Sequence, residues 1–261
     1  KAGTIADGLG TDLDWSNTSS ELSANWTPFT DNDAVTYEYA VGTGTGNETS
    51  GSNSSLSFDG ENDYVQISSD EFRMPRPIQS REGTYVYEGW TAFEYLDGKF
   101  ERGRWEDVID LCITFHDAVF GFLRPAFLDD YENPWTIADH VVWDEQPYTP
   151  DPKIESSVEK LQSILRAIDQ PSQLIHGDFS ENVLFSENHP PVVIDFSPYW
   201  RPAGFALGIV VADALVWGGA DDSIFEKIPP LPDFDQLLAR AELRRIIELD
   251  TNARIGLNNK L

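Results

Sequence analysis

The chain has 261 residues, of which 40% are apolar and 12% aromatic, proportions that are typical of a folded globular protein and exclude a disordered one. Its 45 acidic and 18 basic residues give a net charge of −27. A negative field of this size repels phosphate backbones and anionic lipid surfaces, so we expect neither nucleic acid nor a membrane as partner. No apolar run reaches the roughly 18 residues of a transmembrane helix.

The first 70 residues differ in composition from the rest of the chain. They contain twelve acidic residues and one basic residue, Lys1, and they are rich in Ser, Thr, Asn and Gly. Short runs of apolar residues between polar turns predict strands, and the Gly/Ser/Asn-rich stretch 42–55 predicts a flexible loop. We therefore expect residues 1–70 to form a β-rich segment.

Two sets of short motifs in this segment resemble fragments of extracellular β-domains. Residues 12–15, 22–26 and 37–42 resemble the opening of a fibronectin type III-like repeat. Residues 55–60 and 63–67 resemble the first strands of a laminin-G or concanavalin-like jelly roll. Both modules would be partial, because a β-sandwich of this kind needs about 100 residues.

Helical patterning begins after residue 71. Two strands around a Gly turn are predicted at 84–88 and 90–96, followed by a helix at 104–120 in which Cys112 and His116 are expected to be buried. An irregular link then leads to a helix at 154–168.

Beyond residue 168 we expect two short buried strands and then two more helices. The helix at 205–217 is almost entirely apolar and is therefore expected to be buried. The helix at 234–249 is amphipathic, and we expect Arg240, Arg244 and Arg245 on its polar side. The fold class is therefore α+β.

The most informative stretch runs from His176 to Asp195. A buried strand leads to each of two acidic residues, Asp178 and Asp195, and Asn182 follows the first of them. Phosphoryl transfer needs one carboxylate to accept the proton of the attacking hydroxyl, and a second carboxylate with an amide oxygen to hold Mg²⁺ on the nucleotide phosphates. These three residues have the types and the order for those roles.

The element order, with His176-Gly177-Asp178 and Ile194-Asp195-Phe196, resembles the aminoglycoside phosphotransferase family, relatives of the protein kinases, over about residues 72–261. Segments 124–128, 134–139 and 195–202 resemble an actinobacterial phosphotransferase-like subgroup of unassigned substrate more closely. The resemblance implies a mostly helical kinase-like large lobe at 99–261, preceded at 71–98 by the remnant of a small lobe and hinge.

The resemblance also implies roles for individual residues. Asp178 would be the catalytic base, and His176 would support the catalytic loop through backbone hydrogen bonds. Asn182 and Asp195 would bind Mg²⁺, and Asp213 would brace the loop from a helix. The backbone of a hinge at Glu94, Tyr95 and Leu96 would meet the adenine of ATP, and the second substrate would be a small molecule.

Two features depart from the family pattern. The catalytic loop usually leaves four residues between Asp and Asn, whereas three separate Asp178 from Asn182. The small lobe usually supplies a Gly-rich turn and a phosphate-binding Lys, but no Lys occurs between Lys1 and Lys99. The Gly-rich run 42–46 is a weak match to a phosphate loop, and Arg replaces a phosphate-binding Lys poorly.

Two hypotheses follow from these observations. The first is an ATP-dependent phosphotransferase acting on a small-molecule hydroxyl, with doubtful activity because the phosphate-binding Lys is missing. The second is a non-catalytic, pseudokinase-like or surface-associated protein that binds carbohydrate or protein. ATP chemistry favours a cytoplasmic location, whereas genuine β-modules would favour the cell surface. The substrate and the oligomeric state stay open.

Overall fold

The computed structural model describes the backbone at residues 5–7, 24–26, 49–51, 54–57, 64–67, 69–87, 90–129 and 133–254. It describes side chains at residue 67 and throughout the last three of these ranges. The chain divides into two compact units, residues 1–37 with 249–261, and residues 38–248. Every candidate site residue named above belongs to the second unit. The expected division at residues 70 and 98 stays a prediction.

Short antiparallel strands account for the described residues of the first 67 positions. Strand β1 (Ile5–Asp7) pairs with β2 (Ala24–Trp26). Strands β3 (Thr49–Gly51), β4 (Ser54–Ser57) and β5 (Tyr64–Gln66) form a three-stranded sheet in that order. The stretch 37–42, which resembles part of a fibronectin type III-like repeat, and the Gly-rich run 42–46 lie outside the described residues.

The residues expected to form a remnant of a small lobe contain a second small sheet. Strand β8 (Trp90–Phe93) lies between β6 (Pro77–Ile78) and β7 (Val86–Tyr87), and both pairings are antiparallel. The strand expected at 84–88 is present as β7, and the one at 90–96 as β8, although both are shorter than expected. The pattern did not predict β6.

Two backbone bridges join this region to the catalytic segment. Arg73 forms a parallel bridge with Val192, and Lys99 forms an antiparallel bridge with Phe185. The Arg73 N–H donates to the carbonyl of Pro191 at 2.8 Å. The segment before the hinge is therefore hydrogen-bonded to the strand that leads to Asp195.

Five α-helices and two 3₁₀ helices form most of the described large lobe. The helices are α1 (Trp105–Ala118), α2 (Pro134–Val142), α3 (Glu155–Ile164), α4 (Ala203–Val216) and α5 (Phe234–Arg254), with η1 (Ala126–Asp129) and η2 (Asp222–Lys227) between them. No helix in the described ranges is long and apolar enough to cross a membrane.

Helix α2 corrects the expectation of an irregular link after residue 120. Its N-terminus is a capping box, in which the Asn133 side chain accepts from the Thr136 N–H while the Thr136 hydroxyl accepts from the Asn133 N–H. Pro134 occupies the first turn, where a missing N–H costs nothing. This Asn-Pro-x-Thr signal was present in the sequence and could have located the helix.

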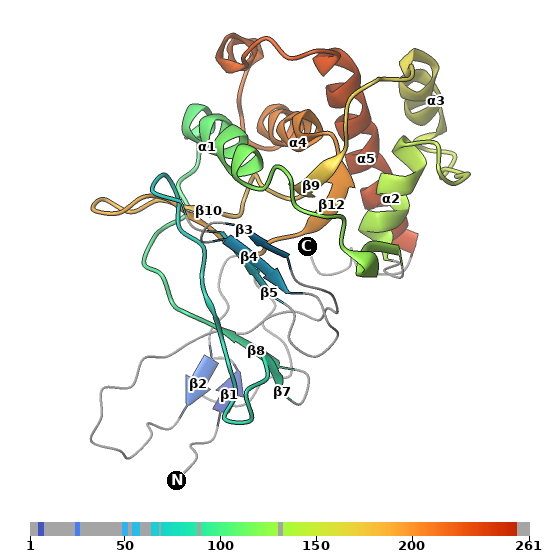
Figure 1. Cartoon of the computed structure of the whole chain (residues 1–261). Coiled ribbons are helices and arrows are strands. Elements are labelled where there is room, and N and C mark those ends of the chain that lie inside the picture. Colours follow the sequence, from blue (N-terminus) through green and yellow to red (C-terminus); the bar gives the residue numbers. More distant parts are fainter. Residues whose placement is uncertain are drawn as a thin grey trace. The chain divides into compact units, whose positions relative to one another are not determined.

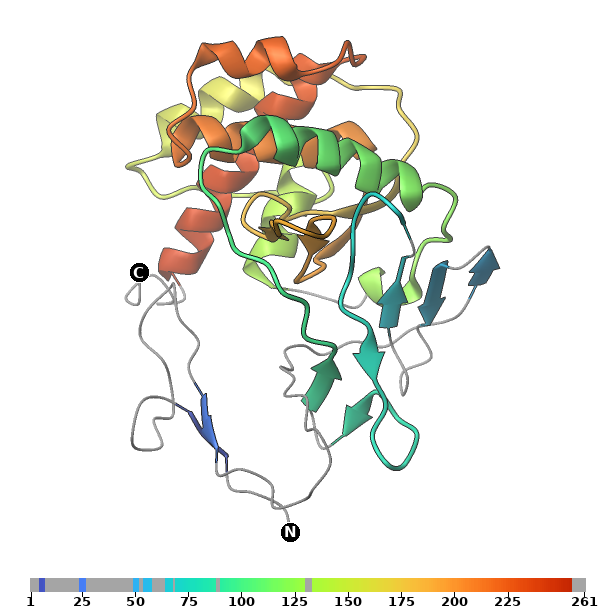
Figure 2. The same ribbon diagram turned by 90° about the vertical axis from the view of Figure 1, so that its left-hand side faces the viewer.

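The segment that contains His176, Asp178 and Asp195 forms two short strand pairs next to the helices. Strand β9 (Gln173–His176) pairs antiparallel with β12 (Pro198–Arg201), and β10 (Val183–Leu184) pairs with β11 (Val192–Val193). Helices α1 and α4 pack on each other and on β9. Figures 1 and 2 show both helices grouped with α5 next to these strands.

The core is built around helix α4, as its composition predicts. Every residue from Phe205 to Ala214 is buried, including the acidic Asp213. Phe115 of α1 is fully buried and packs against Phe179 of the catalytic loop, with ring centroids 5.5 Å apart. The loop that carries Asp178 therefore rests on a dry hydrophobic support.

Helix α5 overturns the expected polar face. Arg240 and Arg244 are 3% and 1% exposed, and the Arg245 side chain is 14% exposed. These arginines face the protein interior because acidic side chains and carbonyls there accept their hydrogen bonds. A prediction from helical periodicity places charged residues on the exposed face of a helix. It cannot include partners that other elements supply.

Candidate functional site

A pair of buried histidines supports the start of the catalytic loop. His176 ends β9 and is completely buried, and its Nδ1 accepts from the backbone N–H groups of Asp178 at 3.2 Å and Ser197 at 3.4 Å. With Nδ1 acting as acceptor, Nε2 carries the proton and donates to the Ile194 carbonyl at 3.1 Å. One imidazole thus joins the segments that lead to Asp178 and Asp195.

His116 of α1 lies behind His176 as a packed core residue. Its Nε2 accepts from the His176 backbone N–H at 3.1 Å, so Nδ1 donates to the Cys112 carbonyl at 2.6 Å. Burial lowers the pKa of both histidines to about 4, which keeps them neutral at pH 7. Cys112 is also buried, and burial raises the pKa of its thiol.

Asp178 presents a half-exposed carboxylate two residues after β9. The Asn182 side chain donates from Nδ2 to the Asp178 carbonyl at 2.6 Å and is 3.5 Å from Oδ2. Both contacts use the amide nitrogen of Asn182, so neither occupies its oxygen. The shorter loop therefore still brings the two residues together.

Asp195 follows β11 in a left-handed backbone conformation, with φ of +49°. Asp tolerates this region better than most residues do. Partial desolvation raises the pKa of Asp195 above its ordinary value, and the carboxylate of Asp178 adds to the increase. The two carboxylates are thus close enough to repel each other, an arrangement that a bound cation would relieve.

Asp213 lies beneath the same loop with two partners. Its Oδ2 accepts from the Ser180 hydroxyl at 2.6 Å, and both of its oxygens accept from the Arg245 guanidinium at 2.8 and 2.6 Å. A buried charge needs such compensation to be tolerated. The acid in the apolar helix α4 is therefore tied to the catalytic loop through Ser180.

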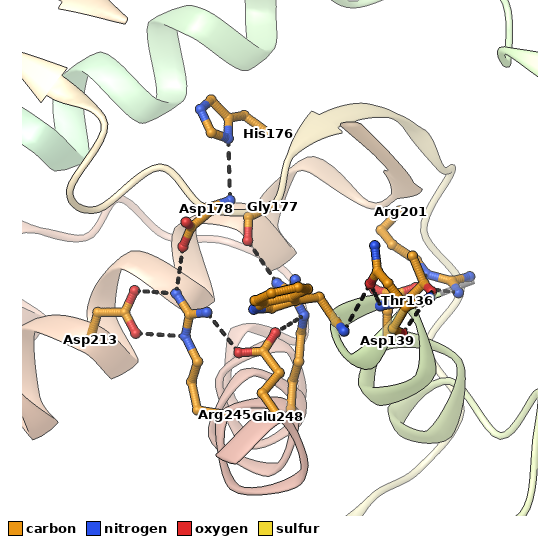
Figure 3. Close-up of polar contacts among 12 residues, drawn as sticks. Thr136, Asp139, His176, Gly177, Asp178, Arg201, Asp213, Arg245 and Glu248 are labelled. Carbon is orange, nitrogen blue, oxygen red and sulfur yellow. Dashed lines mark hydrogen bonds and ion pairs between the residues drawn. The ribbon is translucent and has the colours of Figure 1, made fainter. Parts of the chain in front are cut away.

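Arg245 is the central residue of this network, and no pattern in the sequence distinguishes it from the neighbouring arginines of α5. Figure 3 shows its guanidinium between Asp213, Asp178 and Glu248. Its Nη2 is 3.0 Å from Asp178 Oδ1, and Nη1 donates to Glu248 Oε2 at 2.8 Å. Although burial opposes the effect, the carboxylates of Glu248, Asp213 and Asp178 raise the pKa of Arg245 well above its usual value.

The candidate hinge has a different set of contacts. The Glu94 N–H donates to the Arg76 carbonyl at 2.8 Å, and its carboxylate accepts two hydrogen bonds from the Arg76 guanidinium at 2.8 and 3.1 Å. Tyr95 is 57% exposed. The N–H of Glu94 is therefore already used within the sheet, which leaves Tyr95 and Leu96 as the expected hinge residues whose N–H could meet a nucleotide.

Arg73 and Arg76, two of the cations before the candidate hinge, are paired with acids. Arg73 contacts Asp97 through its side-chain oxygen at 3.4 Å and its carbonyl at 3.0 Å, and Arg76 pairs with Glu94. The structure therefore offers no substitute for the missing Lys from these two arginines without breaking an existing ion pair.

The three segments with the closer subgroup resemblance meet around one cavity of about 310 Å³. Its lining includes Arg124 and Leu128, Thr136 and Asp139, and Tyr199 and Arg201. Arg201 donates to Asp139 at 2.8 Å and forms two bonds of 2.6 Å to Glu145. The sequence around Arg201 is compatible with a phosphate contact or with a structural corner, and these contacts with two acids favour the structural corner.

The comparison with protein-family models identifies the family. The model of the phosphotransferase enzyme family matches residues 52–200, which is more than half of the chain. The chain belongs to this family. The expected phosphotransferase and α+β fold are thus confirmed at the level of the family. The match includes the stretch that resembles a laminin-G strand pair, and the two β-domain resemblances and the actinobacterial subgroup are not confirmed.

Several solved phosphotransferase structures match this chain at low sequence identity. Spectinomycin phosphotransferase APH(9)-Ia in complex with ADP and spectinomycin is 14% identical, with a TM-score of 0.48 over 72% of this chain and 68% of that chain. A thermostable mutant of aminoglycoside phosphotransferase APH(4)-Ia is 16% identical, with a TM-score of 0.47 over 75% of both chains. An aminoglycoside phosphotransferase from Alicyclobacillus acidocaldarius is 14% identical, with a TM-score of 0.41 over 83% and 89%. No curated protein sequence matches significantly.

The residues around Asp195 fit a magnesium ion. Within the described ranges no three His, Cys, Asp or Glu side chains form a metal cage. Mg²⁺ on a nucleotide does not need one, because it takes one or two protein ligands and completes its shell with phosphate oxygens and water. Asp195, whose pKa partial desolvation and the Asp178 carboxylate both raise, and the side-chain oxygen of Asn182, which neither of its contacts with Asp178 occupies, are donors of the kind that Mg²⁺ binds.

Proposed function

We propose that this family member transfers the γ-phosphoryl group of Mg²⁺-bound ATP to a hydroxyl group of a small molecule. The observation that carries the proposal is the meeting of Asp178, Asn182 and Asp195 on adjoining segments, with Asp178 close enough to raise the pKa of Asp195. Each of the three is a residue type that phosphoryl transfer uses.

Asp178 would orient the acceptor hydroxyl and accept its proton. Its carboxylate is half exposed, so a substrate can reach it, while its backbone is held by His176 from below. Because the transition state of phosphoryl transfer is loose, this carboxylate needs accurate placement more than it needs high basicity. The hydrogen bonds to a buried imidazole supply that accuracy.

Asn182 and Asp195 would hold the metal. Bound Mg²⁺ would neutralise charge that develops on the phosphates during transfer. The protein's part is to keep the two ligands in place, and here each ligand segment is fixed: the Ile194 N–H donates to the Asn182 carbonyl at 3.0 Å. The segments that carry the two proposed ligands are therefore joined by a backbone hydrogen bond.

ATP use favours a cytoplasmic location, and the hinge at Tyr95 and Leu96 would receive the adenine. The absence of a Lys between Lys1 and Lys99 removes a usual stabiliser of the phosphates. We therefore expect slow turnover, since losing one preorganised charge contact typically costs about 100-fold or more in rate.

A second candidate function follows from the same absence. The ion pairs of Arg73 with Asp97 and of Arg76 with Glu94 leave neither arginine ready for phosphate. The chain would then be a non-catalytic member of the family that binds nucleotide or a protein partner without transferring phosphate. Nucleotide binding and turnover must therefore be measured separately.

The test combines a binding titration with a turnover assay. ATP binding is measured calorimetrically with and without Mg²⁺, and ADP formation is followed with mixtures of aminocyclitols and other polyhydroxylated compounds. The variants are Asp195→Asn and Asp178→Asn, which keep side-chain shape, and Asp129→Asn is the matched control because its exposed carboxylate pairs only with Arg124 in the described contacts.

We expect Mg²⁺-dependent binding in the wild type and in Asp129→Asn, at least about 10-fold weaker binding in Asp195→Asn, and unchanged binding without turnover in Asp178→Asn. Binding without turnover in the wild type would favour the non-catalytic alternative. An absence of binding in every protein would refute the nucleotide site itself.

A further inference from the structure

One guanidinium on α5 contacts three carboxylates around the catalytic loop. Arg245 binds Asp213 through Nε at 2.8 Å and Nη2 at 2.6 Å, Glu248 through Nη1 at 2.8 Å, and Asp178 through Nη2 at 3.0 Å. Its side chain is 14% exposed, so solvent weakly screens its pairs with the buried Asp213 and Glu248, whereas the carboxylate of Asp178 is half exposed. Figure 3 shows that these partners come from α4, α5 and the catalytic loop.

The geometry of these contacts fixes the orientation of the guanidinium. Two parallel hydrogen bonds to Asp213 set the plane of the Arg245 guanidinium. The hydrogen bond to Glu248 holds the guanidinium in that plane. Nη2, which binds Asp213 and also contacts Asp178, is therefore placed by residues outside the catalytic loop. A Lys ammonium could not hold three directions in this way.

The preceding residue holds the preceding position of the loop. Arg244 is fully buried, donates from Nη1 to the Gly177 carbonyl at 2.7 Å, and lies 4.6 Å from the centre of the Tyr199 ring. Consecutive arginines of α5 thus contact consecutive residues of the loop, Gly177 through its backbone and Asp178 through its side chain.

We propose that Arg245 is a positioning residue that occupies Oδ1 of Asp178 and so assigns Oδ2 to the acceptor hydroxyl. This inference rests on the proposed function, in which Asp178 is the base. Oδ2 has only the 3.5 Å approach of Asn182 Nδ2 among the contacts of the described residues, whereas Oδ1 is held by a charge-assisted bond.

The reaction type makes such a device useful. In phosphoryl transfer the enzyme contributes mainly placement and charge stabilisation, because the transition state is loose. The ion pair with Arg245 restricts the rotation of the Asp178 side chain and leaves one of its oxygens open. It therefore favours accurate placement of the acceptor hydroxyl. A misplacement of about 1 Å can cost about 100-fold in rate.

A double-mutant cycle tests the contact independently of turnover. Arg245→Met, Asp178→Asn and the double variant are unfolded with urea, and the midpoint shifts are compared. If the pair interacts, the shift of the double variant is clearly smaller than the sum of the single shifts. Additive shifts would overturn the proposal, because no Arg245–Asp178 interaction would exist.

The second experiment measures ADP formation by the full chain below its unfolding temperature. We expect kcat to fall about 100-fold in Arg245→Met and about 10-fold in Arg245→Lys, with KM for ATP changed less than about twofold. Arg254→Met is the control on the same helix, because its ion pair is with Asp250. That variant should keep the wild-type kcat.

The outcomes separate this inference from the proposed function. A wild type without turnover refutes the proposed function, and the positioning role with it. An active wild type whose kcat survives Arg245→Met refutes the positioning role alone. A lower unfolding temperature with unchanged kcat in Arg245→Met would show that the residue only stabilises the fold. A kcat of Arg245→Lys between those of Arg245→Met and the wild type supports the positioning role, because Lys restores the positive charge but not the planar guanidinium.

Discussion

Gly177 and Tyr199 are so close that a Cβ atom on Gly177 would overlap with Cδ2 of the tyrosine ring. Tyr199 stands on β12, opposite Ile175 of β9, and its ring therefore covers the backbone just before Asp178. The glycine of His176-Gly177-Asp178 is thus required by a close approach of the two segments.

This contact predicts the effect of adding one methyl group. Gly177→Ala should destabilise the fold by about 1–3 kcal/mol, because the ring is packed against Arg244 and has little room to move. Urea unfolding measures the change. The same substitution in a Tyr199→Leu background should cost much less, and an equal cost in both backgrounds would contradict the steric explanation.

The buried histidines predict a loss of stability in mild acid. Burial lowers the pKa of His116 and His176 from 6.5 to about 4, so below pH 6.5 the unfolded chain takes up protons that the native chain refuses. The contribution of the two neutral histidines to the free energy of unfolding should therefore be fully present above about pH 6.5. It should fall as the pH drops toward 4. The loss is on the order of 3 kcal/mol per histidine.

Urea unfolding at pH 7 and pH 5 checks this prediction, because between these values the carboxylates stay largely ionised. His116→Gln is the matched variant: its amide can replace one acceptor but does not titrate. Its stability should change less between the two pH values than that of the wild type. An equal change would mean that His116 does not remain neutral in the native state.

The Arg201 cluster predicts a structural and not a catalytic effect. Its guanidinium binds Asp139, which is 3% exposed, and forms a bidentate pair with Glu145. Arg201→Met should destabilise the fold by about 3–5 kcal/mol, because Asp139 would be left as a buried, uncompensated charge. Thermal unfolding measures the loss.

A second substitution distinguishes the two readings of Arg201. Arg201→Met combined with Asp139→Asn should recover part of the stability, since the unpaired charge is gone. The affinity for Mg²⁺-bound ATP should stay within about twofold of the wild type in this double variant. A large loss of affinity would instead indicate a phosphate contact.

The cap of α2 predicts a smaller change. Asn133 accepts hydrogen bonds from the N–H groups of Trp135 and Thr136, both at 2.9 Å. Asn133→Ala should cost about 1 kcal/mol of unfolding free energy, whereas Asn133→Ser should cost only a few tenths, since Ser is an equally good cap. Equal losses in the two variants would show that the cap does not stabilise the helix.

Local patterns were sufficient for much of the large lobe. Apolar spacing placed α1, α4 and α5 within a few residues of their ends, because each buries one face or all of its surface. The order His176, Asp178, Asn182 and Asp195 indicated the chemistry, because the roles depend on residue type and chain order. The family match confirms the phosphotransferase reading.

Partners that come from distant parts of the chain could not be predicted. The acid of α4 indicates a missing partner, but Arg245 lies 32 positions further along the chain, and its helical spacing places it on the polar side of α5. Glu94 was chosen for a hinge backbone, and only the register of β6 and β8 shows that its N–H is already used.

The amino-acid sequence by itself determined which chemical groups are available for the proposed phosphoryl transfer, and it also showed that no Lys occurs between Lys1 and Lys99. Only the tertiary structure decided which oxygen of Asp178 is held, which arginines are buried and why residue 177 is glycine. The physical reason is that residue type and spacing set chemistry and local conformation, whereas charge pairing and steric contact depend on atoms that folding brings together from separate elements.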